Sequence, residues 1–371
     1  MQMCIYMLIQ FQYNHLKMSK VFLMLLLMQV KLIFLVIVPD NLIPYPHAEH
    51  TDRKRTHRYV RDCQEKKHGN LTKEFMKPKN ISKTFKLFYI KYRTSTLQYG
   101  HHTIVRDPLN MISVLEPMKP GSCSTKTLSY VTDSAQQRNC IIATNAGFFG
   151  IDGRKKGACL GNIISNGRLV QDADGVQNAN FGIRKDGTVV IGYLSEEEVL
   201  DKTNPFVQLV SGVGWVIRNG EIYLNQSEKA ECRDTQTTGT LRFFFTVKAA
   251  RTLLGYDKLG HVHLIQFDGK THERGVSLYE AASYLKSAGV INAINFDGGG
   301  SATYTANSTV INYPSDLCDE DEPSMLCARK VSTIICIHEG ERTDKSSSSS
   351  ASFSYSTIVM SIDVVLFFML W

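Results

Sequence analysis

The chain has 371 residues, of which 43% are hydrophobic and 21% are charged. These values exclude a disordered or collagen-like protein and allow one large globular domain or two ordinary ones. The formal net charge is +7, but residues 51–93 alone contain 14 basic and four acidic side chains. We therefore expect no nucleic-acid partner, because a nucleic-acid-binding domain carries its positive charge on the folded body.

The first 38 residues have the features of an export signal. After Lys20, the segment from Val21 to Val38 is apolar except for Gln29 and Lys31, which is typical of the hydrophobic region of a signal peptide. No Ala-x-Ala cleavage site follows it. Residues 1–38 are therefore predicted to be a signal peptide or a retained signal anchor, and both alternatives place the chain in the secretory pathway.

Residues 39–100 are predicted to form a basic N-terminal arm. The pattern Arg-x-x-Arg occurs from Arg55 to Arg58 and again from Arg58 to Arg61. This pattern suits proprotein processing, although basic runs are more commonly solvated linkers. The sequence leaves both interpretations open.

Cysteines and glycosylation sequons support an extracytoplasmic location. Of the nine cysteines, Cys4 lies in the export segment and eight remain, which predicts disulfide bonds. The absence of a Cys-x-x-Cys pair excludes zinc-ribbon and thioredoxin-like sites. Four Asn-x-Ser/Thr sequons predict glycosylation at Asn70, Asn80, Asn225 and Asn307.

Residues 101–338 have the pattern of a compact, turn-rich domain. Asx-Gly pairs separate β-like runs and predict hairpins; they begin at Asn166, Asp186, Asn219 and Asp268. Helices are predicted over Ser124 to Arg138, Ser195 to Asp201 and Ser277 to Ala288, the last with a capping box formed by Ser277 and Glu280. The predicted fold class is α+β, with a hairpin-rich mixed or antiparallel β-sheet core, a few packed helices and disulfide bonds.

The C-terminal end has two parts. Residues 339–356 are predicted to be a serine-rich linker, and residues 357–371 are a hydrophobic tail interrupted by Ser361 and Asp363. The tail is shorter than the 20 or so residues of a membrane-spanning helix. It fits either a lipid-anchor signal or part of a longer anchor, so membrane attachment through this segment is one expectation and secretion is the other.

The most distinctive motif follows a predicted strand from Val290 to Phe296. It reads Asp297-Gly298-Gly299-Gly300-Ser301, and three glycines in succession allow the backbone to approach a ligand closely. The carboxylate suits acid–base chemistry, while the exposed amides suit phosphate or sugar oxygens. The alternative is a tight turn in which Asp297 accepts local hydrogen bonds.

Other candidate residues follow strands or open a helix. Asn145 is a candidate for fixing a substrate hydroxyl or for capping its own turn. Arg184 and Arg251 are candidate phosphate clamps or members of surface ion pairs. Asp268 and Glu280 supply further carboxylates, with a hairpin turn and a helix cap as their structural alternatives.

His261 and His263 lie two residues apart on a predicted strand, so both rings are expected on one side. They are interpreted as a solvent-facing pair or as metal ligands. Signatures of zinc proteases, P-loop proteins, serine hydrolases and dinucleotide-binding proteins are absent from the sequence. Kinase, serine-hydrolase and nicotinamide-dependent functions are therefore disfavoured.

Taken together, these ordered segments resemble the phosphodiester glycosidase family over about residues 100–338. The segments that carry the resemblance are Asn145-Ala146-Gly147-Phe148-Phe149, Cys159-Leu160-Gly161-Asn162, Asn180-Phe181-Gly182-Ile183-Arg184, Gly192-Tyr193-Leu194-Ser195-Glu196-Glu197-Glu198, Arg251-Thr252, Asp268-Gly269, Asn295 to Ser301 and Tyr313-Pro314-Ser315-Asp316.

The resemblance implies a glycosidase that cleaves the bond between α-N-acetylglucosamine and phosphate. The product is mannose 6-phosphate on the phosphorylated high-mannose glycans of lysosomal enzymes, and the reaction takes place in the Golgi lumen or at its membrane. Asp297 is expected to be the first catalytic carboxylate, with Asp268 or Glu280 as its partner. Arg184, Arg251, Asn145 and residues Gly298, Gly299, Gly300 and Ser301 are expected to bind substrate.

The resemblance also implies no cofactor and no metal. It implies disulfides that pair Cys123 with Cys159, Cys140 with Cys336, Cys318 with Cys327 and Cys63 with Cys232. Two alternative functions are a metal-dependent phosphodiesterase, with His261, His263, Asp268 and Asp297 as ligands, and an inactive glycan-phosphate binding protein. The sequence makes no prediction of the oligomeric state.

Overall fold

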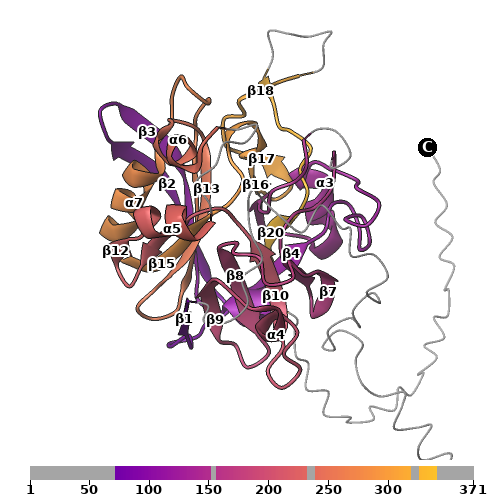
Figure 1. The fold of residues 1–371 in the computed structure, drawn as a ribbon. Coiled ribbons are helices and arrows are strands. Elements are labelled where there is room, and N and C mark those ends of the chain that lie inside the picture. Colours follow the sequence, from indigo (N-terminus) through magenta and orange to yellow (C-terminus); the bar gives the residue numbers. More distant parts are fainter. Residues whose placement is uncertain (1–71, 152–155, 232–238, 319–325, 341–371) are drawn as a thin grey trace, which may run out of the picture. The chain divides into compact units, whose positions relative to one another are not determined.

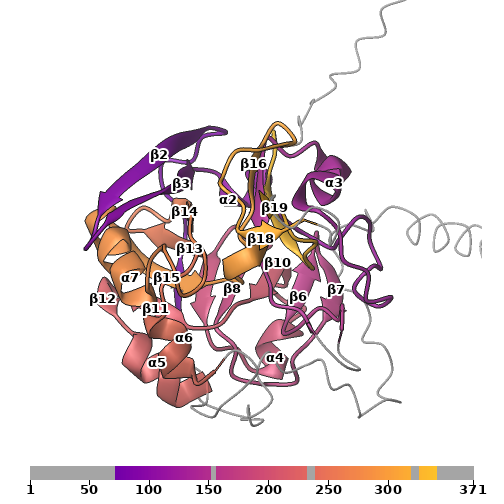
Figure 2. The same ribbon diagram turned by 90° about the horizontal axis from the view of Figure 1, so that it is seen from above.

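The computed structural model describes residues 72–151, 156–231, 239–318 and 326–340. The predicted export segment, Asn70, Cys63, Cys232 and the hydrophobic tail lie outside these residues. Three large β-sheets and one two-stranded ribbon form the domain (Figures 1 and 2), and every strand pairing among the named strands is antiparallel. This confirms the predicted α+β fold and its antiparallel alternative.

The seven-stranded sheet carries most of the candidate site. In spatial order its strands are β12 (Glu221–Ile222), β11 (Trp215–Arg218), β15 (Val290–Asn295), β13 (Arg251–Asp257), β14 (Val262–Phe267), β3 (Leu97–Val105) and β2 (Phe85–Arg93). Helices cover one of its faces, as Figures 1 and 2 show: α5 (Leu224–Glu231), α6 (Leu241–Thr246) and α7 (Leu278–Ser287). Leu253, Phe267 and Leu285 belong to the apolar core between sheet and helices.

The other two large sheets share a core with the opposite face. The six-stranded sheet runs β1 (Lys73–Met76), β9 (Val189–Gly192), β8 (Asn180–Arg184), β10 (Phe206–Ser211), β6 (Ile163–Ser165) and β7 (Arg168–Gln171). The five-stranded sheet runs β17 (Thr309–Val310), β16 (Tyr304–Ala306), β5 (Ile142–Asn145), β20 (Ile334–Ile337) and β4 (Ile112–Leu115). One buried cluster contains Leu254, Phe181 and Ile335, so all three sheets contribute to it.

Short elements complete the domain. They are α2 (Pro108–Met111), α3 (Val131–Ala135), the 3-10 turn Gln136–Arg138, α4 (Glu196–Val199), the 3-10 turn Gly299–Ser301, and the ribbon of β18 (Asp316–Leu317) with β19 (Leu326–Cys327). Among the described residues, no helix is long and apolar enough to cross a membrane.

Two sequence predictions need correction here. The arm predicted over residues 39–100 is wrong from Lys73 onward, because β1, β2 and the start of β3 pair within the sheets. Lysines alternate with aromatics in β2 because it is an edge strand, where lysine discourages pairing with other chains. The helix predicted from Ser124 begins only at Val131; the residues before it form turns next to the disulfide of Cys123.

Within the described residues there are three disulfides, which link Cys123 to Cys159, Cys140 to Cys336 and Cys318 to Cys327. These are three of the four pairs implied by the family resemblance. The sequon residues Asn80, Asn225 and Asn307 are exposed, as glycan attachment requires. Glycosylation at these positions remains a prediction.

Candidate active site

Strand register brings three of the predicted residues to one edge of the seven-stranded sheet. Strands β14 and β15 both pair antiparallel with β13, so they run in the same direction and end at the same edge. Asp268 directly follows β14, Asp297 is the second residue after the end of β15, and Arg251 opens β13 between them. Two strand spacings, roughly 10 Å, separate the backbones that carry the two aspartates.

The loop that holds Asp297 is fixed by its backbone. The Asp297 amide donates to Ala146 O (3.0 Å), the Gly298 amide donates to Asp297 Oδ1 (2.9 Å), and Asn145 Nδ2 donates to Asp297 O (2.6 Å). Asn145 is fully buried, and its Oδ1 accepts from Thr252 Oγ1 at 2.9 Å. Asn145 therefore positions the Asp297 loop, and its amide is not open to substrate as the sequence suggested.

Neighbouring atoms approach the loop closely on two sides, which explains why Gly298, Gly299 and Gly300 are glycines. A Cβ on Gly298 would lie 2.6 Å from Ala250 O, and a Cβ on Gly300 would lie 2.5 Å from Nη2 of Arg329. Gly299 has a φ of +58° and donates its amide to Ala250 O at 2.9 Å. The loop is thus packed between β13 and an arginine side chain.

Arg329 is the functional candidate that sequence reasoning missed. Its Nε and Nη2 donate to the two carboxylate oxygens of Asp316 (2.6 and 3.1 Å), and Nη1 donates to Ser301 Oγ at 3.4 Å. The side chain is 38% exposed, so the guanidinium is open to a ligand as well. The disulfide Cys318–Cys327 joins the ribbon that carries Asp316 to the segment that carries Arg329.

The Asp297 carboxyl has unusual electrostatics. Burial raises the pKa of Asp297 to about 6, and this effect outweighs the Ser301 hydroxyl, the charge of Arg329, the Gly298 amide and the charge of Arg251, all of which lower the pKa. A carboxyl with a raised pKa beside a cation and a glycine-rich loop is typical of a catalytic acid or nucleophile. Of the predicted carboxylates, Asp297 is the one that combines these features.

Asp268 is half-buried at the same edge. Its Oδ1 accepts from Gln266 Nε2 and from the Tyr313 amide, each at 3.1 Å, and its own amide donates to Tyr99 O at 2.9 Å. The Asp268-Gly269 pair does not join two strands of the sheet, because it opens the longer connection from β14 to α7. The predicted hairpin turn is therefore wrong here, and Asp268 stays a candidate second carboxylate.

Arg251 acts at this edge through its charge. The side chain is 1% exposed; Nη2 donates to Phe244 O (2.7 Å) and Val247 O (2.8 Å), and Nε donates to Val276 O (3.3 Å). Burial lowers the pKa of Arg251 to about 10, against the opposing charge of Asp297. Arg251 is thus a buried cation next to the Asp297 loop, not the open phosphate clamp that was predicted.

Arg184 lies elsewhere. Arg184 is the last residue of β8 and pairs with Phe206. The first end of β8 is the one near Asn295: the Gly212 amide donates to Ala179 O, and the Val213 amide donates to Asn295 O. Arg184 Nη1 donates to Asp201 Oδ2 (3.1 Å) and Asn204 O (2.5 Å). The structure therefore places Arg184 in an ion pair that closes a loop, which was its structural alternative.

Glu280 caps a helix. Its carboxylate accepts from the amide (2.8 Å) and hydroxyl (3.0 Å) of Ser277 and from Lys248 Nζ (3.3 Å). Burial opposes ionisation, but these hydrogen bonds outweigh it and lower the pKa of Glu280. The capping-box prediction is confirmed, and both carboxylate oxygens are engaged away from the Asp297 loop.

Replacing Glu280 by Ala is expected to lower the free energy of unfolding by about 1 kcal/mol and to leave kcat/KM within about twofold. Glu198→Ala is a matched control, because Glu198 completes the capping box of α4 and also pairs with a lysine, Lys73. Urea unfolding of both variants checks the stability. A hundredfold fall in kcat with unchanged stability would return Glu280 to the list of catalytic residues.

The four residues predicted as metal ligands of the alternative phosphodiesterase do not lie together in the structure. His261 and His263 lie at the beginning of β14, while Asp268 follows its end. Both histidines are buried, each has a ring nitrogen 3.5 Å from Asp257 Oδ2, and His263 Nδ1 is 2.9 Å from His102 Nε2. The solvent-facing interpretation of the pair is therefore wrong as well.

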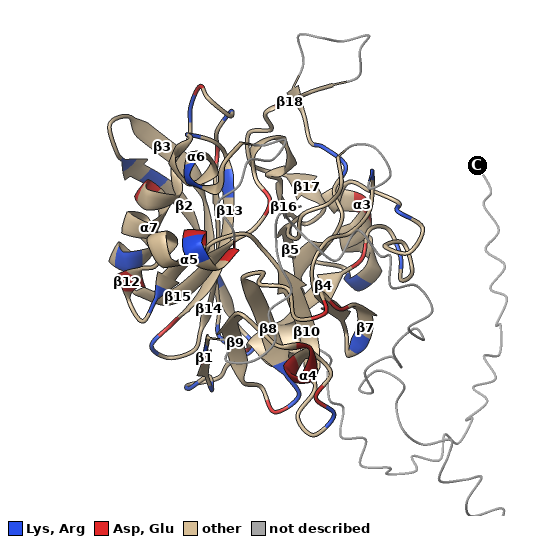
Figure 3. Cartoon of the chain, viewed as in Figure 1, with Lys and Arg blue, Asp and Glu red and all other residues tan. Residues whose placement is uncertain are grey.

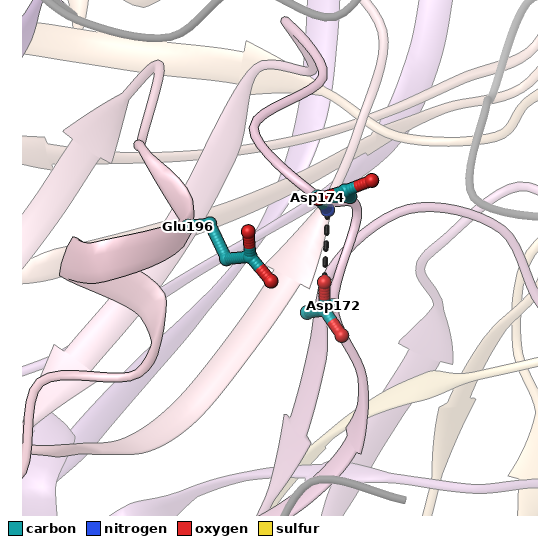
Figure 4. Close-up of side chains that lie close together, drawn as sticks. All are labelled: Asp172, Asp174 and Glu196. Carbon is teal, nitrogen blue, oxygen red and sulfur yellow. Dashed lines mark hydrogen bonds between the residues drawn. The ribbon is translucent and has the colours of Figure 1, made fainter. Parts of the chain in front are cut away.

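One group among the described residues has carboxylates close enough to hold a metal ion. Figure 4 shows Asp172 and Asp174, which follow β7, and Glu196, which opens α4; one oxygen from each lies within 4.8 Å of the others. Asp172 Oδ1 accepts the Asp174 amide at 2.9 Å. Figure 3 shows α4 as an acidic helix of the six-stranded-sheet region. This group shares no member with the Asp297 site.

Comparison with known proteins identifies the family. The family model described as phosphodiester glycosidase matches residues 138–338. The chain belongs to the phosphodiester glycosidase family. The solved catalytic domain of zebrafish N-acetylglucosamine-1-phosphodiester alpha-N-acetylglucosaminidase, auto-inhibited by its pro-peptide, is 48% identical with a TM-score of 0.68; the match covers 76% of this chain and 93% of that one.

Two curated relatives in this family carry the same enzyme name. The mouse protein is 46% identical over 81% of this chain, and the bovine protein is 50% identical over 68% of it. These matches span 57% and 47% of the relatives' own lengths. The chain therefore covers about half of the length of the curated phosphodiester glycosidases it matches.

Proposed function

We propose that the chain hydrolyses α-N-acetylglucosamine-1-phosphodiesters and so exposes mannose 6-phosphate on the glycans of lysosomal enzymes. The observation that carries this proposal is the Asp297 carboxyl, with its raised pKa, held between a glycine loop and the partly open guanidinium of Arg329. The names of the relatives, N-acetylglucosamine-1-phosphodiester alpha-N-acetylglucosaminidases, support the choice of substrate.

The geometry suits the two halves of such a substrate. The diester is an anion, and Arg329 offers it a guanidinium already oriented by the two hydrogen bonds that it donates to Asp316. Arg251 adds buried positive charge beneath the same loop. The cations stabilise the phosphate both in the substrate and as it leaves.

The bond-breaking step takes place at the anomeric carbon. As the bond from that carbon to the phosphate oxygen lengthens, its electron pair moves to the phosphate and positive charge grows on the sugar ring. In its ionised form Asp297 stabilises that charge, and Asp268 is placed to accept a proton from the attacking water. The water oxygen bonds to the carbon, and a phosphate monoester is released, which requires little general-acid assistance.

We also propose that the reaction occurs in the secretory pathway, in the Golgi lumen or at its membrane, with phosphorylated high-mannose glycoproteins as partners. Three disulfides and three exposed sequons support an oxidising, glycosylating compartment. Membrane or lipid attachment through residues 357–371 and processing in the basic arm are proposals that lie outside the described residues.

An isotope experiment tests the function. The purified chain is incubated with GlcNAc-α-phosphomannose in water enriched in heavy oxygen, with and without EDTA, and the label is located by mass spectrometry. Label in N-acetylglucosamine, unaffected by chelator, is the expected result, because it requires attack at the anomeric carbon. Label in phosphate that is lost with EDTA would instead establish a metal-dependent phosphodiesterase, and no turnover would favour the binding protein.

The pH profile gives a further prediction. Since the ionised form of Asp297 is proposed to act, kcat/KM is expected to rise with pH through an apparent pKa of about 6. The charge of Arg329 lowers the pKa of Asp297, so Arg329→Lys should leave this limb in place and Arg329→Ala should move it to higher pH. Profiles of the three proteins check this; a limb that does not move in Arg329→Ala would contradict the assignment to Asp297.

A further inference from the structure

Three exposed tyrosines lie on segments close to Asp268, and the proposed chemistry does not use them. Tyr89 is 63% exposed, Tyr99 is 40% exposed and Tyr313 is 64% exposed. We call these three residues the tyrosine rim. A soluble domain exposes single apolar side chains commonly, but a group of aromatics beside a candidate active site marks a recognition surface.

Strand register puts two members of the rim on the same face as Asp268. Tyr89 pairs with His101, and His101 pairs with Gln266. Side chains two residues apart on a strand share a face, so Tyr99 lies on the face of His101 and Asp268 lies on the face of Gln266. The rings of Tyr89 and Tyr99 are 6.0 Å apart with an interplanar angle of 34°, and the edge of His101 supports Tyr89 at 5.6 Å.

Direct hydrogen bonds tie the rim to the site. The Asp268 amide donates to Tyr99 O, and the Tyr313 amide donates to Asp268 Oδ1. The guanidinium carbon of Arg274 lies 5.6 Å from the centre of the Tyr313 ring. Arg274 belongs to the connection from β14 to α7, which also brings Thr271 close to Gly299. The Asp268 charge contributes to a raised pKa of Tyr89, after the effect of burial, which places the phenol near that carboxylate.

The chemistry of the rim matches a sugar better than a purely apolar ligand. Each tyrosine presents a flat apolar ring for the C–H face of a pyranose and a hydroxyl for its oxygens. The exposed rings have few rotatable bonds, so binding orders them at low entropic cost. In the proposed substrate, N-acetylglucosamine occupies one side of the phosphate and a mannose chain extends from the other.

We propose that the tyrosine rim binds the mannose oligosaccharide that carries the phosphodiester, and that it selects glycans over small diesters. This inference rests on the proposed function, because that function supplies the glycan. The rim begins at Asp268, roughly two strand spacings from the backbone of Asp297, which is far enough to contact the part of the substrate beyond the sugar being removed. A second copy of the chain is the competing occupant of these aromatic side chains.

The test compares two substrates and adds a binding measurement. kcat/KM is determined for GlcNAc-phosphomannose and for a high-mannose oligosaccharide bearing the same diester, and their ratio is the readout. Tyr89→Ala is expected to lower the ratio of glycan to small substrate about five- to tenfold, mainly through KM. Tyr89→Phe, which keeps the ring, should keep the ratio within twofold.

Phe75→Ala is the matched control, since Phe75 is 67% exposed on β1 of the six-stranded sheet; its ratio should equal that of the wild type. Binding of unphosphorylated high-mannose oligosaccharide, measured by saturation-transfer NMR, should be present in the wild type and lost in Tyr89→Ala. If Tyr89→Ala left the ratio of kcat/KM for the glycan to that for the small diester unchanged, the inference would be overturned. An unchanged ratio together with loss of a dimer in Tyr89→Ala would show that a second copy of the chain occupies the rim instead. Oligosaccharide binding that depends on Tyr89 without hydrolysis of either diester would overturn the proposed function and leave the rim standing.

Discussion

Asp297→Asn is expected to reduce kcat on the phosphodiester by about a thousandfold or more, without a loss of stability. The substitution removes the charge that is proposed to stabilise the transition state. It keeps the shape of the loop, because an asparagine Oδ1 can accept the same Gly298 amide hydrogen bond that Asp297 accepts at 2.9 Å. Steady-state kinetics and thermal unfolding of the purified variant check the two parts.

Asp186→Asn is the control, since Asp186 lies in the exposed turn after β8 and should tolerate the same change. Full turnover by Asp297→Asn would remove Asp297 from the mechanism.

The stability of the Asp297→Asn variant also has a defined pH dependence. Burial raises the pKa of Asp297 above its value in the unfolded chain, so ionisation destabilises the wild type as pH rises from about 4 to 6. The variant should therefore gain stability relative to the wild type across that window.

Arg329→Ala is expected to raise KM for the phosphodiester about 10- to 100-fold, as loss of a charged hydrogen-bonding partner of the phosphate implies. Arg329→Lys should recover only part of this, because lysine cannot make the two-pronged contact with Asp316. Kinetics with the small diester provide the measurement, since that substrate isolates the phosphate and the removed sugar.

Arg184→Ala tests whether Arg184 or Arg329 binds the phosphate of the substrate. Arg184 pairs with Asp201 and stacks on Phe206 at 4.2 Å, so its loss should lower the unfolding midpoint and leave KM unchanged. If Arg184→Ala instead raised KM while Arg329→Ala did not, the sequence-based assignment would be right and the structural one wrong.

Local signals were sufficient for much of the fold. The Asx-Gly turns at Asn166, Asp186 and Asn219 each close a hairpin, because that dipeptide adopts the backbone angles of a tight turn. The capping box of α7 likewise depends only on residues three apart. Asp297 could be singled out because the glycines beside it are a signal that lies within five residues.

Non-local contacts account for what the sequence did not reveal. Arg329 reaches the Gly300 backbone across 29 positions of sequence, and its own surroundings contain no motif. In the sequence, Arg184 and Arg251 both come after short apolar segments, so only the pairing of β8 with β10 shows that Arg184 lies away from the site. Helices α5 and α6 were not predicted, because their stability comes from packing on the seven-stranded sheet more than from their short sequences.

The disulfide between Cys318 and Cys327 closes the segment in which Asp316 and Arg329 face each other. Under reducing conditions this tether opens, and the guanidinium loses the constraint that holds it beside the glycine turn. The position of Arg329 beside the glycine turn is therefore coupled to the redox state of the compartment in which the chain folds. An oxidising compartment allows this disulfide to form, whereas a reducing one leaves the segment without the cross-link.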